Sequence, residues 1–273
     1  MQKILLLGKN GQLGKALKKE LSGDFEVSDF GKNELDILDF SKIAEICGKL
    51  NPNFLVNAAA YTAVDRAEAE QDLALKINSE AVGNLAKICK KSRAKLIHFS
   101  TDYVFDGKRN EGFAEDDEPN PINFYGESKL AGERKILESG CNFAIIRTSW
   151  LFGAGKNFAQ TMLELAKNNP EIKVVSDQTG CPTFTEDLAE ATKNLMFTGQ
   201  NGIFHLTNAG VTNWADFARK IFELAAPKVK VIDIPTSEYP TPAHRPNNSV
   251  LLNTKLPKLR SWEEGLGEYL EKN

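Results

Sequence analysis

Tyr125 and Lys129 stand four residues apart and are the pair in this sequence best suited to transfer a proton. On a helix, this spacing places both side chains on one face. A phenol with a pKa of about 10 is a poor acid–base catalyst at neutral pH, and a neighbouring ammonium stabilises its anion. We therefore predict that Lys129 lowers the pKa of Tyr125, which then acts as the proton-transfer group. The spacing is also common by chance, so other residues must support it.

Polar residues directly follow an apolar run upstream of this pair. Ser100, Thr101 and Asp102 come after residues 96–99, which read LIHF. Polar residues at the carboxyl end of a central strand face the cofactor crevice in parallel sheets. We expect Thr101 to hydrogen-bond a substrate carbonyl oxygen beside Tyr125, and the alternative is a threonine that caps a loop.

The two histidines that lie within apolar runs are expected to belong to the core. His98 lies inside the LIHF run, and His205 lies between Phe204 and Leu206. A buried histidine with satisfied hydrogen bonds is the more common state for such positions, so neither is assigned to catalysis.

Three glycines, Gly8, Gly11 and Gly14, connect the first apolar run to the first amphipathic stretch in the pattern G-x-x-G-x-x-G. Glycine permits a tight turn and lets the backbone approach a pyrophosphate, whose charge the following helix N-terminus stabilises. A glycine triplet alone also fits an ordinary loop. Its place between the first strand and the first helix favours a dinucleotide-binding turn.

Two charged residues after this turn bear on which dinucleotide binds. Asp29 stands about 20 residues beyond the glycines, where a carboxylate can hold the ribose 2′-hydroxyl of NADH. Lys32 is near enough to pair with the 2′-phosphate of NADPH. Both residues also suit a solvated turn, so the sequence leaves NADPH or NADH open.

Short apolar runs alternate with amphipathic stretches over the first 150 residues and predict the elements that position these groups. We expect strands at 3–7, 25–28, 54–57, 95–100 and 142–147. We expect helices at 12–21, 41–49 with Ser41 as its N-cap, 72–92 and 125–139. This alternation predicts an α/β fold with a Rossmann-type, doubly wound parallel sheet.

The alternation of apolar runs with amphipathic stretches becomes irregular after Trp150. We expect a helix at 158–168, a short strand at 173–175, a helix opened by a capping box of Thr183 and Glu186, and ordered loops in the proline-dense segment 235–246. Residues 1–150 and about 183–205 are expected to form the NAD(P)-binding Rossmann domain. Residues about 151–182 and 206–273 are expected to form a smaller C-terminal α/β domain that binds the substrate.

Composition excludes several classes of protein. The net charge of −3 without a basic cluster argues against nucleic-acid binding. No apolar run reaches the roughly 20 residues of a membrane span, and the run after Met1 is too short for a signal peptide. The four cysteines are widely separated and the three histidines lack ligand spacing, so we expect no metal. Reduced thiols fit a cytoplasmic protein.

The sequence resembles the extended short-chain dehydrogenase/reductase family and, within it, the dTDP-4-dehydrorhamnose reductases. The similar segments cover nearly the whole chain and are residues 8–14, 57–65, 100–107, 125–132, 147–150, 177–183 and 239–246. The resemblance implies NAD(P)H-dependent reduction of the C4 keto group of dTDP-4-dehydro-L-rhamnose to dTDP-L-rhamnose. In that reaction Tyr125 protonates the developing alkoxide and Thr101 orients it.

The motifs and the resemblance together give a set of expected ligand contacts. The cofactor residues are Gly8, Asn10, Gly11, Gln12, Leu13, Asp29, Asp36, Ile37, Ala58, Ala59, Tyr61 and Lys129, the last on the nicotinamide ribose. The residues facing the sugar nucleotide are Val64, Asp65, Thr101, Asp102, Tyr103, Tyr125, Trp150, Asn157, Phe158 and Arg245. Trp150 is either an apolar wall against the deoxysugar or core at the domain junction. Arg245 is assigned to the diphosphate by charge pairing.

Some dimeric members of this subfamily hold a metal at their interface through an acidic residue early in the first helix. Ala16 stands at that position here, which argues against a magnesium-dependent dimer and leaves a monomer or a homodimer.

Two other functions remain as alternatives. One is another nucleotide-sugar epimerase or dehydratase of the extended family. Dehydratases usually follow the threonine with Asp-Glu, whereas Tyr103 follows Asp102 here. The other is a non-catalytic regulatory subunit like that of methionine adenosyltransferase, and the intact set of Thr101, Tyr125 and Lys129 favours an enzyme instead.

Overall fold

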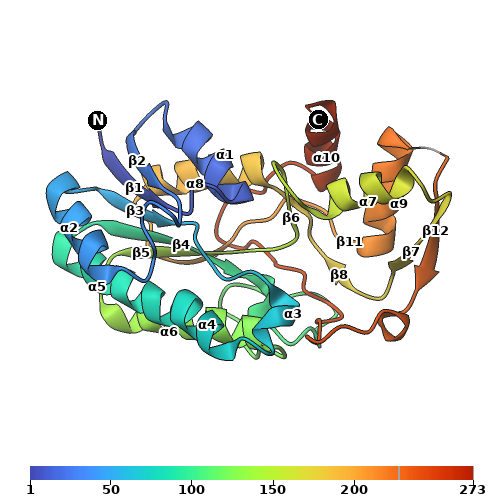
Figure 1. Ribbon diagram of the computed structural model, residues 1–273, viewed down its shortest axis with the longest axis horizontal. Coiled ribbons are helices and arrows are strands. Elements are labelled where there is room, and N and C mark those ends of the chain that lie inside the picture. The colour runs from blue at the N-terminus through green and yellow to red at the C-terminus, as the bar shows by residue number, and fades with distance from the viewer. Residues whose placement is uncertain (227, 273) are drawn as a thin grey trace.

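A parallel sheet of six strands forms the centre of the computed structural model, which describes residues 1–226 and 228–272 (Figure 1). In spatial order the strands are β2 (Glu26–Phe30), β1 (Lys3–Leu7), β3 (Phe54–Asn57), β4 (Lys95–Thr101), β5 (Phe143–Thr148) and β10 (Gly202–His205). The order of the strands reverses between β1 and β3. Open parallel sheets bind their ligands at the carboxyl ends of the strands beside such a reversal.

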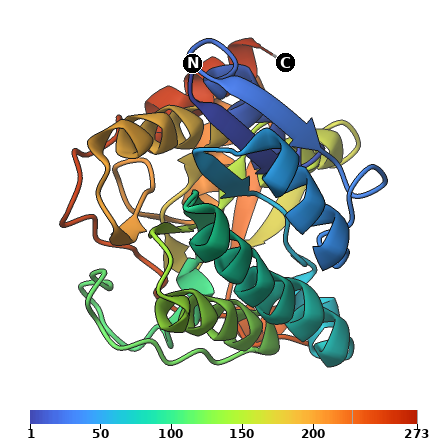
Figure 2. The ribbon, with the colours of Figure 1, turned by 90° about the vertical axis from the view of Figure 1, so that its left-hand side faces the viewer.

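Helices cover both faces of this sheet (Figure 2). On one face lie α1 (Gln12–Leu21) and α8 (Thr185–Thr198), and on the other lie α2 (Phe40–Leu50), α5 (Ala81–Ser92) and α6 (Phe124–Ser139). Each layer buries an apolar core, with Leu17 and Leu188 in the first and Ile43 and Leu85 in the second. The arrangement confirms the predicted Rossmann-type α/β fold.

The segments after Trp150 build a smaller group of elements beside the sheet (Figure 1). Its helices are α7 (Phe158–Ala166), α9 (Trp214–Ala225) and α10 (Trp262–Glu271). Its strand pairs are β7 (Glu171–Val175) with β12 (Lys230–Ile234), β6 (Leu151–Phe152) with β9 (Thr183–Phe184), and β8 (Thr179–Gly180) with β11 (Thr212–Asn213). They share a core around Phe152, Phe217 and Trp262. In the described part of the chain, no helix has both the length and the apolarity of a membrane span.

Two helices connect β3 to the following long helix. These are α3 (Val64–Ala67) and α4 (Gln71–Leu75), and a π-helical turn at Lys76–Glu80 joins α4 to α5. The predicted helix at 72–92 is therefore helical over its whole length, but its middle part is a π-helical turn rather than an α-helix. Short 3-10 turns lie at Asp102–Val104 and Thr236–Glu238, the second within the proline-dense segment that was predicted as loops.

The predicted boundaries at the second strand and second helix are wrong. β2 runs to Phe30 because its pairing with β1 continues through Leu7, so Asp29 lies inside the strand rather than after it. The N-cap of α2 is Asp39, whose carboxylate accepts from the backbone N–H of Lys42 at 3.1 Å. Ser41 instead donates its hydroxyl to Asp39.

The predicted capping box at Thr183 is also wrong. Thr183 belongs to β9, and its hydroxyl donates to the carbonyl of Cys181 at 3.3 Å. Helix α8 begins at Thr185 without a side-chain cap. A reciprocal capping box does form at α10, between Ser261 and Glu264.

A buried ion pair fastens α6 to the sheet. Arg147 on β5 and Glu133 on α6 are 2% and 1% exposed, and Arg147 Nη2 lies 2.7 Å from Glu133 Oε2. The hydroxyl of Ser100 on β4 donates to the same carboxylate. Because Tyr125 and Lys129 precede Glu133 at four-residue steps, this anchor places their helix face over the end of β4.

We expect Arg147→Met to lower the free energy of unfolding by about 3–5 kcal/mol, because it leaves the Glu133 carboxylate buried without its cation. Urea denaturation followed by circular dichroism measures the change. Lys49→Met is the control, since it removes a pair with Glu45 that is exposed to solvent and should leave stability nearly unchanged. A similar small effect for both variants would contradict the anchoring role.

Candidate active site

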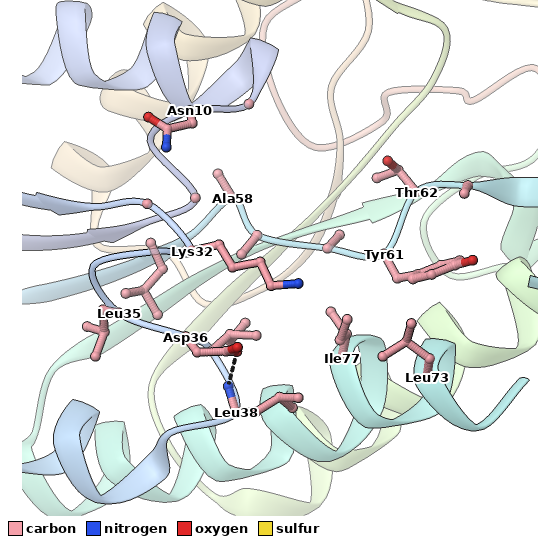
Figure 3. A pocket seen from close by; sticks show the side chains of 18 of the residues that line it. Asn10, Lys32, Leu35, Asp36, Leu38, Ala58, Tyr61, Thr62, Leu73 and Ile77 are labelled. Atoms are coloured by element: carbon pink, nitrogen blue, oxygen red, sulfur yellow. Dashed lines mark hydrogen bonds between the residues drawn. The ribbon is translucent and has the colours of Figure 1, made fainter. Parts of the chain in front are cut away.

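A cavity of about 470 Å³ opens beside the strand reversal between β1 and β3 (Figure 3). Its walls come from the glycine turn, the loop after β2, the segment after β3, and the helical stretch that contains α3 and α4. Eight of the predicted cofactor residues line it: Gly8, Asn10, Gly11, Asp36, Ile37, Ala58, Ala59 and Tyr61.

The glycine turn packs so closely that side chains do not fit at two of its positions. Gly8 has a φ of +88°, and a Cβ there would lie 2.6 Å from the carbonyl carbon of Ala58. A Cβ at Gly14 would lie 2.0 Å from the carbonyl oxygen of Gly8. The N-terminus of α1 follows with no side-chain cap at Gly11, so its first N–H groups remain for an anion. The turn therefore fits a dinucleotide pyrophosphate.

The far wall of the cavity suits an adenosine. Asp36 accepts from the backbone N–H of Leu38 at 2.9 Å, and Leu73 and Ile77 supply apolar surface from the helical stretch (Figure 3). The side chain of Lys32 reaches across the cavity in the direction of Tyr61 (Figure 3). Lys32 thus presents a cation to the cavity.

Four predicted cofactor residues lie outside the lining of this cavity, and the fourth, Lys129, is described with the reaction centre below. Asp29 pairs with Lys9 at 3.1 Å and with Lys18 at 3.0 Å, which occupies its carboxylate. Leu13 is buried in the core beneath α1. The side-chain amide of Gln12 donates to the carbonyl of Lys156 at 2.7 Å. Two lysines thus converge on the Asp29 carboxylate in the fold, and its assignment to a ribose hydroxyl stays a prediction.

The predicted reaction centre comes together at the carboxyl end of β4. Thr101 is the last residue of that strand, and its hydroxyl is close enough to the phenol of Tyr125 on α6 to affect its pKa. Thr101 also donates to Asp102 Oδ1 at 2.9 Å and accepts from the backbone N–H of Tyr103 at 3.2 Å. The rings of Tyr103 and Tyr125 meet edge to face, with centroids 6.0 Å apart. Four residues predicted to face the substrate therefore form one cluster.

The predicted effect of Lys129 on the phenol is contradicted. Burial and the negative charge of Asp102 raise the pKa of Tyr125, and the hydrogen bond with Thr101 offsets this only in part. Lys129 Nζ is turned toward the sheet and donates to the carbonyl of Phe99 at 2.6 Å. Tyr125 therefore stays a protonated phenol at neutral pH, which is the form that a proton donor requires.

Lys129 is itself almost fully buried. Desolvation lowers its pKa to about 8, and the negative charge of Glu133 counteracts part of that shift. Its Nζ also lies 3.5 Å from Nε2 of His98. His98 and His205 are both buried, as predicted for core histidines, and the Nδ1 of His205 lies 3.1 Å from the carbonyl oxygen of Leu252.

Asp65 and Arg245, which were both predicted to face the sugar nucleotide, are bonded to each other. Arg245 Nη1 lies 3.0 Å from Asp65 Oδ1, and Nη2 lies 2.9 Å from Oδ2. Arg245 also donates to the carbonyl of Ala243 at 3.0 Å, so the pair ties the proline-dense loop to α3, next to Val64. The guanidinium that was assigned to the diphosphate thus has its carboxylate partner within the protein.

The remaining predicted substrate residues have structural partners beyond the sheet. Asn157 caps α7 by accepting from the N–H of Gln160, and its amide donates to the carbonyl of Gly153 at 2.7 Å. Trp150, with a φ of +46°, stacks on Trp214 at a centroid distance of 3.5 Å. This stack supports the interpretation of Trp150 as part of the junction between the two groups of elements.

Asn78 is a site residue that the sequence did not single out. Its side chain accepts from the backbone N–H of Tyr61 at 2.9 Å and donates to the carbonyl of Tyr61 and the hydroxyl of Ser128. It thereby joins the cofactor loop to α6. An asparagine inside a helical stretch carries no sequence pattern that would reveal such contacts.

Comparison with known proteins identifies the family. The family model described as RmlD substrate binding domain matches residues 1–273. The dTDP-4-dehydrorhamnose reductases of Burkholderia thailandensis and Escherichia coli K12 are 41% and 40% identical, over 97% and 98% of this chain and 97% and 96% of theirs.

Solved structures give the same result. The crystal structure of dTDP-4-dehydrorhamnose reductase from Bacillus anthracis in complex with NADP matches with a TM-score of 0.97 and 40% identity, over 100% of both chains. A UDP-glucose 4-epimerase from Thermus thermophilus in complex with NAD shares only the fold, at 20% identity, a TM-score of 0.83, and coverage of 99% of this chain and 98% of its own. Because these matches extend along nearly the whole chain, this protein belongs to the RmlD family of dTDP-4-dehydrorhamnose reductases.

Proposed function

We propose that this protein reduces the C4 keto group of dTDP-4-dehydro-L-rhamnose to give dTDP-L-rhamnose, with NADPH or NADH as the reductant. The observation that carries the proposal is the cluster of Thr101, Tyr103 and Tyr125 at the carboxyl end of a central strand of a dinucleotide-binding sheet. The names of relatives about 40% identical over nearly the whole chain support the choice of substrate.

The bound nicotinamide supplies the hydride. Tyr125, which is protonated at neutral pH, donates its phenolic proton to the oxygen that becomes the C4 hydroxyl. Thr101 holds the same oxygen in place by a hydrogen bond. Lys129, anchored on the Phe99 carbonyl, holds the nicotinamide ribose beside them.

We assign the sugar nucleotide to the side of the site formed by Asp102 and Tyr103, which adjoins Tyr125. We also propose the division expected from sequence, with residues 1–150 and about 183–205 binding the cofactor and about 151–182 and 206–273 binding the substrate. The return of α8 and β10 to the main sheet supports it.

We also propose a cytoplasmic location, because the four cysteines are free thiols. The expected oligomeric state remains a monomer or a homodimer.

The purified protein is expected to oxidise one NADPH or NADH for each dTDP-4-dehydro-L-rhamnose consumed. Absorbance at the nicotinamide band measures the cofactor, and NMR of the product identifies the C4 configuration. An epimerase or dehydratase recycles its cofactor and would show no net oxidation. A regulatory binding subunit would leave both the keto sugar and the cofactor unchanged.

Tyr125→Phe is expected to reduce kcat by about 10²–10⁴-fold, because the developing alkoxide loses its proton donor. Binding of NADPH, followed by fluorescence titration, should be kept because the ring and its packing remain. Tyr239→Phe is the matched control, since its side chain is exposed and is assigned to neither ligand. Undiminished turnover in Tyr125→Phe would remove this residue from the mechanism.

Lys32→Ala is expected to weaken NADPH binding about tenfold, the loss of one charge-assisted contact to the 2′-phosphate. NADH binding should change less than about twofold, since it has no such phosphate. The Kd values come from fluorescence titration with both cofactors. Lys42→Ala is the control, because that lysine donates to the carbonyl of Glu34 and does not line the cavity. Equal weakening for both cofactors would place Lys32 away from the 2′-position.

A further inference from the structure

A buried line of polar groups joins the cofactor loop to the catalytic helix. The backbone N–H of Ala59 donates to Asn57 Oδ1 at 3.1 Å, and Asn57 Nδ2 lies 3.1 Å from His98 Nδ1. The other ring nitrogen of His98, Nε2, lies 3.5 Å from Lys129 Nζ. Asn57 and His98 are direct register partners on β3 and β4, so the line crosses two strands before it reaches α6.

The backbone N–H of Ala59, at the start of this line, determines which group donates and which accepts in each hydrogen bond that follows. A backbone N–H can only donate, so the oxygen of Asn57 faces Ala59 and its NH₂ group faces His98. An NH₂ group can only donate as well, so Nδ1 of His98 accepts. Burial alone, the larger cause, lowers the pKa of His98 well below its usual range, and any positive charge on Lys129 lowers it further, so the ring is neutral. Its single proton is therefore on Nε2, the nitrogen that faces Lys129.

The Nε2–H of His98 points at the amino group of Lys129. Because only the neutral amine has a lone pair that can accept this hydrogen, the contact favours the neutral amine over the ammonium. The neutral amine also keeps a hydrogen for the carbonyl of Phe99. The other charged group beside Lys129 is Glu133 on α6, which favours the ammonium, although Arg147 on β5 pairs with that carboxylate. Tyr125, one turn earlier on α6, is a neutral phenol.

We propose that His98 is a positioning residue that acts through Lys129. Asn57 holds its ring in the Nε2–H tautomer, and this N–H sets both the place and the protonation of the Lys129 amine. The line thereby connects the loop at Ala59, which lines the cofactor cavity, to the amine that holds the nicotinamide ribose. The inference rests on the proposed function for its effect on turnover, but the tautomer itself does not.

The tautomer can be read from the free protein by long-range ¹H–¹⁵N correlation of the histidine rings at pH 7. His98 should carry its proton on Nε2. His205 is an internal control of opposite sign, because its Nδ1 faces the carbonyl of Leu252 and must donate. His98→Gln and His205→Gln assign the signals. An Nδ1–H or doubly protonated ring at His98 would overturn the proposal, whether or not the protein reduces any sugar.

Asn57→Asp tests the effect on Lys129. A carboxylate accepts from both Ala59 and His98, so the ring proton should move to Nδ1 and leave a bare Nε2 toward Lys129. An Nε2 without a proton favours the ammonium form of Lys129, so the pKa of Lys129 should rise. The high-pH limb of the kcat/KM profile, which we assign to the loss of that proton, should therefore move up by about one pH unit. His205→Gln should leave the limb in place.

Two outcomes separate this inference from the proposed function. A switched tautomer with an unmoved high-pH limb would show that His98 has no influence on Lys129, and would refute the positioning role. Absence of keto-sugar reduction in the unaltered protein would refute the proposed function, while the ring spectrum would still decide the state of His98. If Asn57→Asp does not fold, the spectrum of the unaltered protein decides the proposal alone.

Discussion

The buried ion pair between Glu133 and Arg147 is the interaction on which the active site depends. Charges buried in a protein are stabilising only when their hydrogen bonds are nearly complete. Here Ser100 donates to the carboxylate, and the carbonyl of Glu115 accepts from the guanidinium at 3.4 Å. The pair fixes the rotation of α6 relative to β4 and β5. Since Tyr125 and Lys129 lie on the same helical face, their positions follow from this anchor.

Tyr125 and Lys129 have different electrostatic surroundings and therefore different roles in the site. The phenol is buried near the carboxylate of Asp102, and both burial and that charge raise its pKa, which Thr101 offsets only in part. The amine is turned away from it, toward the Phe99 carbonyl and the ring of His98. A site arranged in this way holds a proton ready for an acceptor oxygen, as a reduction of a ketone requires.

Ion pairs also decide which charges are available to ligands. Asp29 is held by two lysines and does not line the cavity, whereas Lys32 does. Arg245 is held by Asp65, so the loop before it is tied to α3 and its guanidinium is already paired. In both cases a charged residue that the sequence offers to a ligand is used inside the fold.

The sequence alone determined the Rossmann-type sheet and the glycine turn, because these depend on local periodicity and short spacings. It also grouped Thr101 with Tyr125, because polar residues at the carboxyl end of a central strand face the cofactor crevice. Several other features depend on contacts between residues far apart in the chain. The lysines around Asp29, the pairing of Asp65 with Arg245, and the cap at Asp39 instead of Ser41 are of this kind. The raised pKa of Tyr125 has the same origin, since four-residue spacing fixes a shared face but not the direction of the Lys129 side chain. Only the packing of α6 on β4 decided that direction, by bringing a backbone carbonyl and a buried imidazole within reach of the amine.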